Sequence, residues 1–76
     1  MQVVYKIERV KDWVGVLTLE RLGFSWHIKH RINGKMEKVA QSYYYTKDKQ
    51  KALDNLNNNY NTCTGLARDL FNYKED

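Results

Sequence analysis

The chain of 76 residues contains one cysteine and no proline. Because Cys63 is the only thiol, an internal disulfide is excluded, and Cys63 with His27 and His30 matches no familiar spacing of a tetrahedral zinc site. No apolar run approaches the ~20 residues that a transmembrane helix requires. The first 13 residues are charged and alternating, unlike a signal peptide. The sequence therefore predicts a cytoplasmic protein with no metal, no cofactor and no membrane partner.

Motifs typical of catalysis are also missing. The sequence has no pair of carboxylates at a suitable spacing, no glycine-rich phosphate loop and no cluster of metal ligands. It therefore predicts a binding protein and not an enzyme. The net charge of +4 and the pI of about 9.3 suit a nucleic acid or an acidic protein surface as partner, but an ordinary basic domain has the same balance.

The length allows one domain over residues 1–76. An apolar content of 42%, with 13% aromatic residues, favours a folded chain. A domain of this size buries only about 60–65% of the surface that its unfolded chain exposes, and its core supplies about 3–5 kcal/mol. Without a disulfide or a metal, its stability depends on good packing or on self-association.

The first twenty residues predict two strands. Residues 3–8 alternate between apolar and polar side chains, as in a half-buried strand. Residues 13–20 (WVGVLTLE) are rich in β-branched and large apolar side chains and predict a second strand, in which Gly15 marks a bulge or a close approach. A short helix over residues 17–22 is the alternative.

Residues 24–32 give the clearest strand pattern, and this strand ends at Asn33-Gly34. This dipeptide predicts a two-residue hairpin, because a type I′ turn needs positive φ at both central positions. We expect the return strand to cover residues 35–45. Such a turn fixes the register, and the predicted pairs are Ile32–Lys35, Arg31–Met36, His30–Glu37, Lys29–Lys38, Ile28–Val39, His27–Ala40, Trp26–Gln41, Ser25–Ser42 and Phe24–Tyr43.

A helix is predicted after the hairpin, with Thr46 as N-cap and Asp48 in the first turn. An asparagine-rich stretch over residues 55–61, together with Gly65, costs ~4 kcal/mol relative to alanine. The helix therefore either depends on tertiary contacts or breaks near residues 61–65. We favour a helix over residues 47–60 and a continuation or second short helix over about 64–73. Its apolar stripe consists of Leu53, Leu56, Tyr60, Cys63, Ala67 and Leu70. The fold class is α+β: an antiparallel meander of three to four strands, followed by a C-terminal helix packed on one face.

Residues 24–59 resemble the YegP-like family of small uncharacterised domains. The matching features are the aromatic strand, the Asn33-Gly34 turn, the return strand with Val39-Ala40-Gln41-Ser42, and Tyr45-Thr46-Lys47 before a helix. The resemblance implies a three-stranded meander with one helix across it, in a unit that tends to occur in pairs. It implies no catalytic residue. The segment over residues 13–20 and the tail after Asn61 depart from the family pattern.

The same order of strands and helix is similar to the DNA-binding sheet domains of phage integrases and AP2-type factors, which place the polar face of a sheet in the major groove. In the predicted register a basic face consists of His27, Lys29, Arg31 and Lys38. Like charges that directly oppose each other, as Lys29 and Lys38 do, destabilise a sheet slightly. This face predicts a site for nucleic acid or for an acidic partner. The alternative is an ordinary solvated sheet face.

Aromatic and apolar residues predict a protein interface. Tyr44 points opposite to Tyr43 and Tyr45, so one side of this run faces outward, unless Tyr43 and Tyr45 are core residues and Tyr44 is covered. An unbroken C-terminal helix would be ~40 Å long, more than so small a sheet can cover. Its far half would then need a second copy, as a homodimer, or a host protein. The predicted interface residues are Tyr44, Ala67, Leu70, Phe71 and Tyr73.

Two functions are therefore predicted. The first is a protein-binding inhibitor or adaptor that acts on a host macromolecule, since the composition resembles that of small proteins from AT-rich phages or mobile elements. The second is a nucleic-acid-binding module that uses the basic face. The moderate net charge favours the first slightly.

Overall fold

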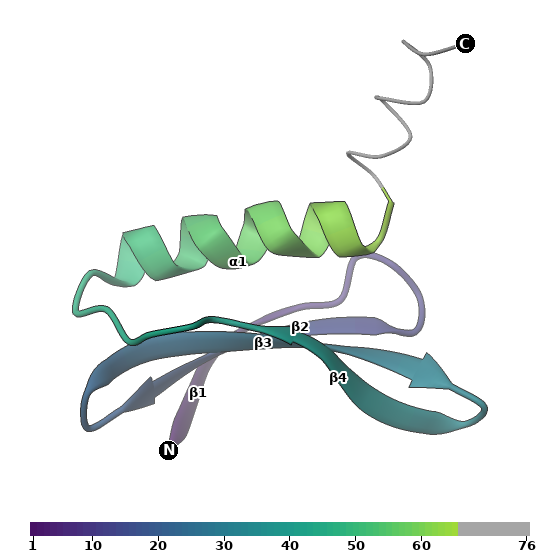
Figure 1. Ribbon diagram of the computed structural model, residues 1–76, viewed down its shortest axis with the longest axis horizontal. Helices are drawn as coiled ribbons and strands as arrows, with labels where there is room; N and C mark the ends of the chain where they lie inside the picture. Colours follow the sequence, from purple (N-terminus) through teal and green to yellow (C-terminus); the bar gives the residue numbers. More distant parts are fainter. Residues whose placement is uncertain (66–76) are drawn as a thin grey trace, which may run out of the picture.

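The computed structural model describes residues 1–65, which form an antiparallel sheet and one helix (Figure 1). Its strands lie side by side in chain order, and the helix crosses one face of the sheet (Figure 1). This arrangement confirms the predicted α+β meander with a helix on one face. The elements are β1 (Gln2–Ile7), β2 (Trp13–Glu20), β3 (Gly23–Ile32), β4 (Lys35–Gln41) and α1 (Lys49–Cys63).

The segment over residues 17–20 is part of β2, so the alternative of a helix over residues 17–22 is wrong. Leu17 pairs with Tyr5 on one side and with Trp26 on the other, which gives its backbone two neighbouring strands. A central position of this kind suits the apolar run of β2, because side chains of two neighbouring strands flank its own and help to bury them.

The turn between β3 and β4 has the predicted form. Asn33 has φ 52° and Gly34 has φ 82°, as the primed two-residue turn requires. The four pairs nearest the turn, from Ile32–Lys35 to Lys29–Lys38, are confirmed. The local chemistry of the turn therefore sets the register of the first half of the hairpin.

Beyond Lys29 the predicted register is wrong. A β-bulge follows, and Ile28 pairs with Ala40 where Val39 was expected. Because a bulge inserts one extra residue into one strand, every later partner is displaced. The small Ala40 side chain packs against the core, whereas Val39 is exposed. The other displaced partners are Gln41 opposite His27, Ser42 opposite Trp26, and Thr46 opposite Phe24.

The core lies between the sheet and α1. The sheet contributes Ile7, Leu17, Trp26 and Ile28, and the helix contributes Ala52, Leu56 and Tyr60. Of the predicted helix stripe, Leu56 and Tyr60 are buried, while Leu53 and Cys63 are only half-buried at its edges. A Cβ atom on Gly15 would lie 3.1 Å from both Leu56 Cδ1 and Tyr60 Cδ2, so Gly15 marks a close approach of β2 to the helix.

Helix α1 begins two residues later than predicted. Its N-cap is Asp48, whose carboxylate accepts a hydrogen bond from the backbone N–H of Lys51 (3.2 Å). Thr46 is not the N-cap, because its backbone pairs with Phe24 in the sheet. A carboxylate at the N-cap also satisfies the partial positive charge of the helix terminus.

The asparagine-rich segment stays helical, and α1 ends at Cys63 with Gly65 at φ 89°. Arg9 contacts this segment: its guanidinium donates to the side-chain oxygens of Asn57 (3.3 Å) and Asn61 (3.1 Å). The expectation of a further helix over residues 64–73 lies largely outside the described residues. So do the predicted interface residues Ala67, Leu70, Phe71 and Tyr73.

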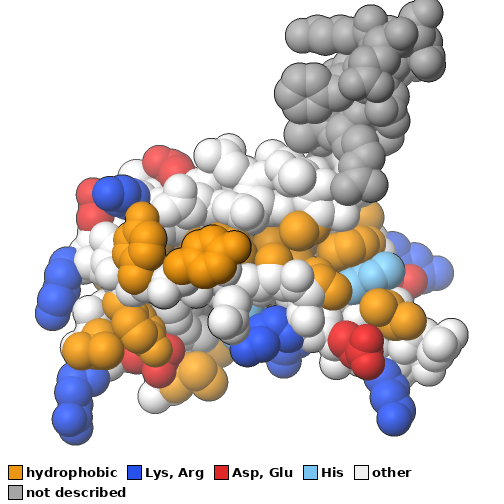
Figure 2. Space-filling view, viewed as in Figure 1, with side chains coloured by type: hydrophobic (Ala, Val, Ile, Leu, Met, Phe, Trp, Pro, Cys, Tyr) orange, Lys and Arg blue, Asp and Glu red, His pale blue; other side chains and the backbone are white. Residues whose placement is uncertain are grey.

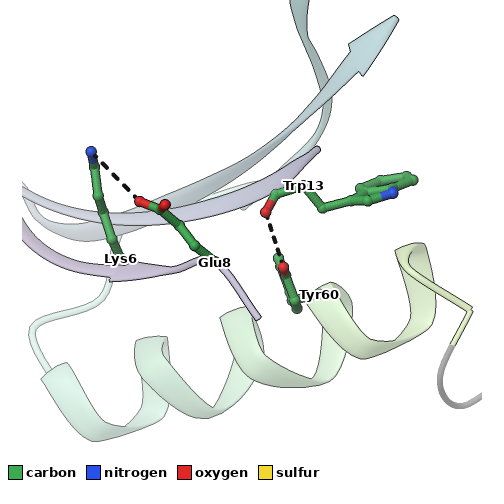
Figure 3. Close-up of polar contacts among 4 residues, drawn as sticks. All are labelled: Lys6, Glu8, Trp13 and Tyr60. Carbon is green, nitrogen blue, oxygen red and sulfur yellow. Dashed lines mark hydrogen bonds and ion pairs between the residues drawn. The ribbon is translucent and has the colours of Figure 1, made fainter. Parts of the chain in front are cut away.

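Tyr60 anchors the connection between β1 and β2 to the helix. Its hydroxyl accepts a hydrogen bond from the Val10 N–H (2.9 Å) and donates one to the carbonyl of Trp13 (3.0 Å; Figure 3). The Trp13 ring stacks on His30 with 3.8 Å between ring centroids. His30 also pairs with Glu37 as predicted, and its stacking on Trp13, which packs against the core, places it on the helix-covered face.

Candidate functional site

Within residues 1–65, the face of the sheet opposite α1 carries no helix (Figure 1). We call it the outer face. On the central strands its side chains include Val16 and Thr18 from β2 and Ser25, His27 and Lys29 from β3. Val16 and Thr18 are buried there, although the core cluster lies on the other side of the sheet. Side chains of the neighbouring strands therefore cover them, and the outer face is a packed surface.

Lys29 and Lys38 oppose each other directly across β3 and β4, as predicted. Within residues 1–65, the ion pairs are Lys6–Glu8 (4.0 Å) and Arg31–Asp12 (3.5 Å). Neither Lys29 nor Lys38 therefore has a carboxylate within ion-pair distance in the part of the chain that the structure describes. Two adjacent ammonium groups without a counter-charge leave this part of the sheet positive.

Among residues 1–65, Arg31 has a carboxylate partner, unlike Lys29 and Lys38. Its Nε lies 3.5 Å from the Asp12 carboxylate, and its backbone N–H donates to the Asp12 carbonyl (2.8 Å). These contacts connect Arg31 to the β1–β2 connection. His27, Lys29 and Lys38 line one groove, and Arg31 is not among its lining residues.

His27 lies beside the two lysines on the outer face. Burial lowers the pKa of its imidazole below the ordinary value of 6.5, and the positive charges of Lys29 and Lys38 lower it further. The imidazole is therefore held in its neutral form near neutral pH. A bound anion would offset the repulsion from both lysines and raise this pKa again.

The three residues line an open groove of about 630 Å³, which we call the basic groove. At its other end Thr18 Oγ1 lies 3.0 Å from Ser25 Oγ, and Ser25 Oγ donates to the Glu20 carboxylate (3.3 Å). The groove therefore has a cationic end and an end of hydroxyl groups with one carboxylate. An anion is attracted to the first end and repelled from Glu20 at the second.

A tyrosine segment, Tyr43–Tyr45, borders the basic groove. Ser42 donates its backbone N–H to the Trp26 carbonyl (2.9 Å), and Thr46 exchanges two backbone bonds with Phe24. The three tyrosines between these anchors leave the sheet edge. Their exposed fractions are 97% for Tyr43, 65% for Tyr44 and 41% for Tyr45. The alternative in which Tyr43 and Tyr45 are core residues and Tyr44 is covered is therefore wrong.

Gly23 permits the return of the chain at Thr46. It has φ 134°, and a Cβ atom at this position would lie 2.6 Å from the Thr46 carbonyl oxygen. A side chain would collide with the backbone that closes the tyrosine segment. The segment is thus held at both ends, which limits the conformational entropy that its tyrosines lose on binding.

A second groove, of about 440 Å³, lies between α1 and β4. We call it the helix–strand groove. Its walls include Phe24, Trp26 and Ala40 from the sheet and Asn55 and Asn59 from the helix. Figure 2 shows apolar side chains gathered between the helix and the sheet, and lysine and arginine side chains both beside the helix and below the sheet.

The described part of the chain contains no cluster of three or more His, Cys, Asp or Glu side chains that could hold a metal ion. Over the same residues, no helix combines the length and the apolar character that a membrane span needs. Comparisons with protein-family models, with curated proteins and with solved structures find no match to this chain. Its function is therefore inferred from its own geometry.

Sequence reasoning located the cations of the site but missed most of its other walls. Gln41, Tyr43 and Tyr45 line the basic groove because the bulge and the looped segment carry them there. The run of three tyrosines was the available signal. The helix residues Asn55 and Asn59 gave no signal, because asparagine in a helix was read only as a cost to stability.

Proposed function

We propose that the protein binds nucleic acid through its outer face, with phosphate groups held at the cationic end of the basic groove. The observation that carries the proposal is the cross-strand pair of Lys29 and Lys38, which has no carboxylate partner among residues 1–65 and lies beside His27 in a groove. Lysine ammonium groups are suitable partners for phosphate oxygens, and counterion release makes each contact favourable at low salt.

The pair also has a cost that a purely structural surface has no reason to carry. Like charges directly opposite each other destabilise a sheet by a few tenths of a kcal/mol. A phosphate between the two ammonium groups would convert this repulsion into two attractions. The lowered pKa of His27 also supports a bound phosphate. Burial and the two lysine charges disfavour the protonated imidazole, and an anion beside His27, Lys29 and Lys38 would interact favourably with all three side chains.

Fluorescence anisotropy of a labelled oligonucleotide tests the proposal, with salt varied from about 50 to about 300 mM. The double variant Lys29→Gln/Lys38→Gln is expected to bind more weakly and to reduce the slope of log affinity against log salt by about 1.5. The matched control is Lys11→Gln/Lys35→Gln, which removes the same charge from an exposed position in the β1–β2 connection and from the exposed first residue of β4, neither of which lines a groove. It should change the slope much less.

Thermal unfolding of the same variants separates binding from folding. Lys29→Gln/Lys38→Gln removes a like-charge pair, so it should be at least as stable as the parent. Equal salt slopes for the groove variant and for its control would contradict the proposal, because binding would then reflect net charge alone.

A protein-binding adaptor is the second candidate, and the exposure of the tyrosine segment favours it. Rigid aromatic side chains with polar tips are frequent at protein interfaces. If the protein binds no oligonucleotide even at low salt, this candidate takes precedence. A host protein or a second copy would then be the partner, and Tyr44 the first residue to substitute.

A further inference from the structure

We propose that the helix–strand groove accepts one unstacked nucleobase, so that the ligand is a single strand and not a duplex. This inference rests on the proposed function, but it uses different residues. The volume of about 440 Å³ lies within the range of roughly 300–1,000 Å³ that is typical of small-ligand sites. The apolar walls come from Phe24, Trp26 and Ala40.

The groove also offers the polar groups that a base edge needs. Asn55 and Asn59, one helical turn apart on the same face of α1, both line this groove. Each amide combines a donor and an acceptor, as do the edges of the bases. Asn59 Nδ2 donates to the backbone carbonyl of Asn55 (2.8 Å), whereas the Asn55 side chain has no hydrogen-bond partner among residues 1–65. Asn55 is therefore available to a ligand.

The two grooves share lining residues at one edge of the sheet. Both are lined by Trp26 and by residues 41–44. A strand with a phosphate at Lys29 and Lys38 can therefore pass over the tyrosine segment and reach the helix–strand groove. Tyr43 and Tyr44 stand at the crossing point with exposed rings, which are suitable surfaces for stacking of a base.

This route distinguishes single strands from duplexes. In a duplex the bases are stacked and paired, so none can enter the groove between α1 and β4 unless the duplex is opened. The cationic end alone would hold either form by its phosphates. Preference for the single strand must therefore come from the helix–strand groove and from the tyrosine segment.

The test compares three probes of about 12 nucleotides: a single strand, the same strand annealed to its complement, and an abasic strand with the same number of phosphates. We expect the single strand to bind about tenfold more tightly than the abasic strand, and more tightly than the duplex. Asn55→Ala should weaken binding of the single strand about two- to tenfold and leave the abasic strand unaffected.

The matched control is Asn58→Ala, the same substitution at an exposed position of α1 that lines neither groove. It should leave all three affinities unchanged. The inference is overturned if the abasic strand binds as tightly as the single strand, if the duplex binds most tightly, or if Asn55→Ala behaves like Asn58→Ala. In each case a loss of binding in Lys29→Gln/Lys38→Gln would still support the proposed function. Failure of all three probes to bind at low salt would remove both.

Discussion

The two faces of the sheet are made by the same strands but have opposite chemistry. On the helix-covered face, Leu17, Trp26 and Ile28 are buried against Leu56 and Tyr60. On the outer face, the alternating residues of β3 are Ser25, His27 and Lys29, and no helix covers them in the described part of the chain. Because side chains alternate along a strand, one face supplies the core and the other carries the residues of the proposed site. Substitutions on the two faces should therefore have separable effects on folding and on binding.

The largest expected effect comes from the covered face. Leu56→Ala removes a fully buried side chain that contacts the sheet, and such substitutions cost about 2–5 kcal/mol. This is comparable to the ~3–5 kcal/mol that the core of so small a domain supplies. We expect most of the protein to be unfolded, as measured by urea denaturation followed by circular dichroism.

Leu22→Ala is the control for this prediction. Leu22 lies in the connection between β2 and β3 with 63% of its surface exposed, so its loss should change the free energy of unfolding by less than about 0.5 kcal/mol. A Leu56→Ala protein as stable as Leu22→Ala would mean that α1 contributes little to stability, contrary to the packing seen here.

The contrast between the faces was predictable from sequence, but the position of the sheet edge was not. The Asn33-Gly34 turn imposes a register that holds through Lys29–Lys38, and alternation then places Trp26 and Ile28 inward. No short sequence motif marks the bulge after Lys38. The bulge brings Ala40 instead of Val39 against the core, and that core is completed by α1, which follows later in the chain. The exposed tyrosine segment and the second groove follow from that displacement.

Two features depend on partners that are distant in sequence. Arg31 was predicted for the binding face, and Asp12 pairs with it from the β1–β2 connection. The helix was expected either to depend on tertiary contacts or to break near residues 61–65; α1 ends at Cys63, and Asn57 and Asn61 accept hydrogen bonds from Arg9. Intrinsic propensity is a weak guide when tertiary contacts of this kind are present.

A smaller effect on stability is expected where the helix meets the β1–β2 connection. Tyr60→Phe keeps the ring in the core but removes the hydroxyl that bonds Val10 and Trp13. The loss should cost about 1–2 kcal/mol, because a half-buried N–H loses its acceptor. Urea denaturation measures this cost. Tyr43→Phe, on a side chain that is 97% exposed, is the matched control and should have no measurable cost.

Binding in the Tyr60→Phe protein sharpens the comparison of the two faces. The folded fraction should bind an oligonucleotide with the affinity of the parent, since Tyr60 lines neither groove. A change in affinity after correction for the unfolded fraction would show that the two faces are coupled through the sheet.

The smallest effect is a pH dependence that has opposite signs for folding and for binding. The folded-state pKa of His27 lies below its ordinary value, so the unfolded chain binds more protons as the pH falls through 6.5. The free energy of unfolding should therefore decrease as the pH is lowered from about 7.5 towards the folded-state pKa. Affinity for an anionic ligand should increase over the same interval, because a protonated imidazole attracts phosphate.

His27→Gln isolates this contribution, since glutamine keeps a polar side chain but does not titrate. Both pH dependences should be flatter in the variant than in the parent, measured by urea denaturation and by anisotropy at matched ionic strength. The effect on stability is small because the His27 side chain is only partly buried and remains in contact with water. Identical pH profiles of affinity in the two proteins would place the bound phosphate away from His27, and so away from the cationic end of the basic groove.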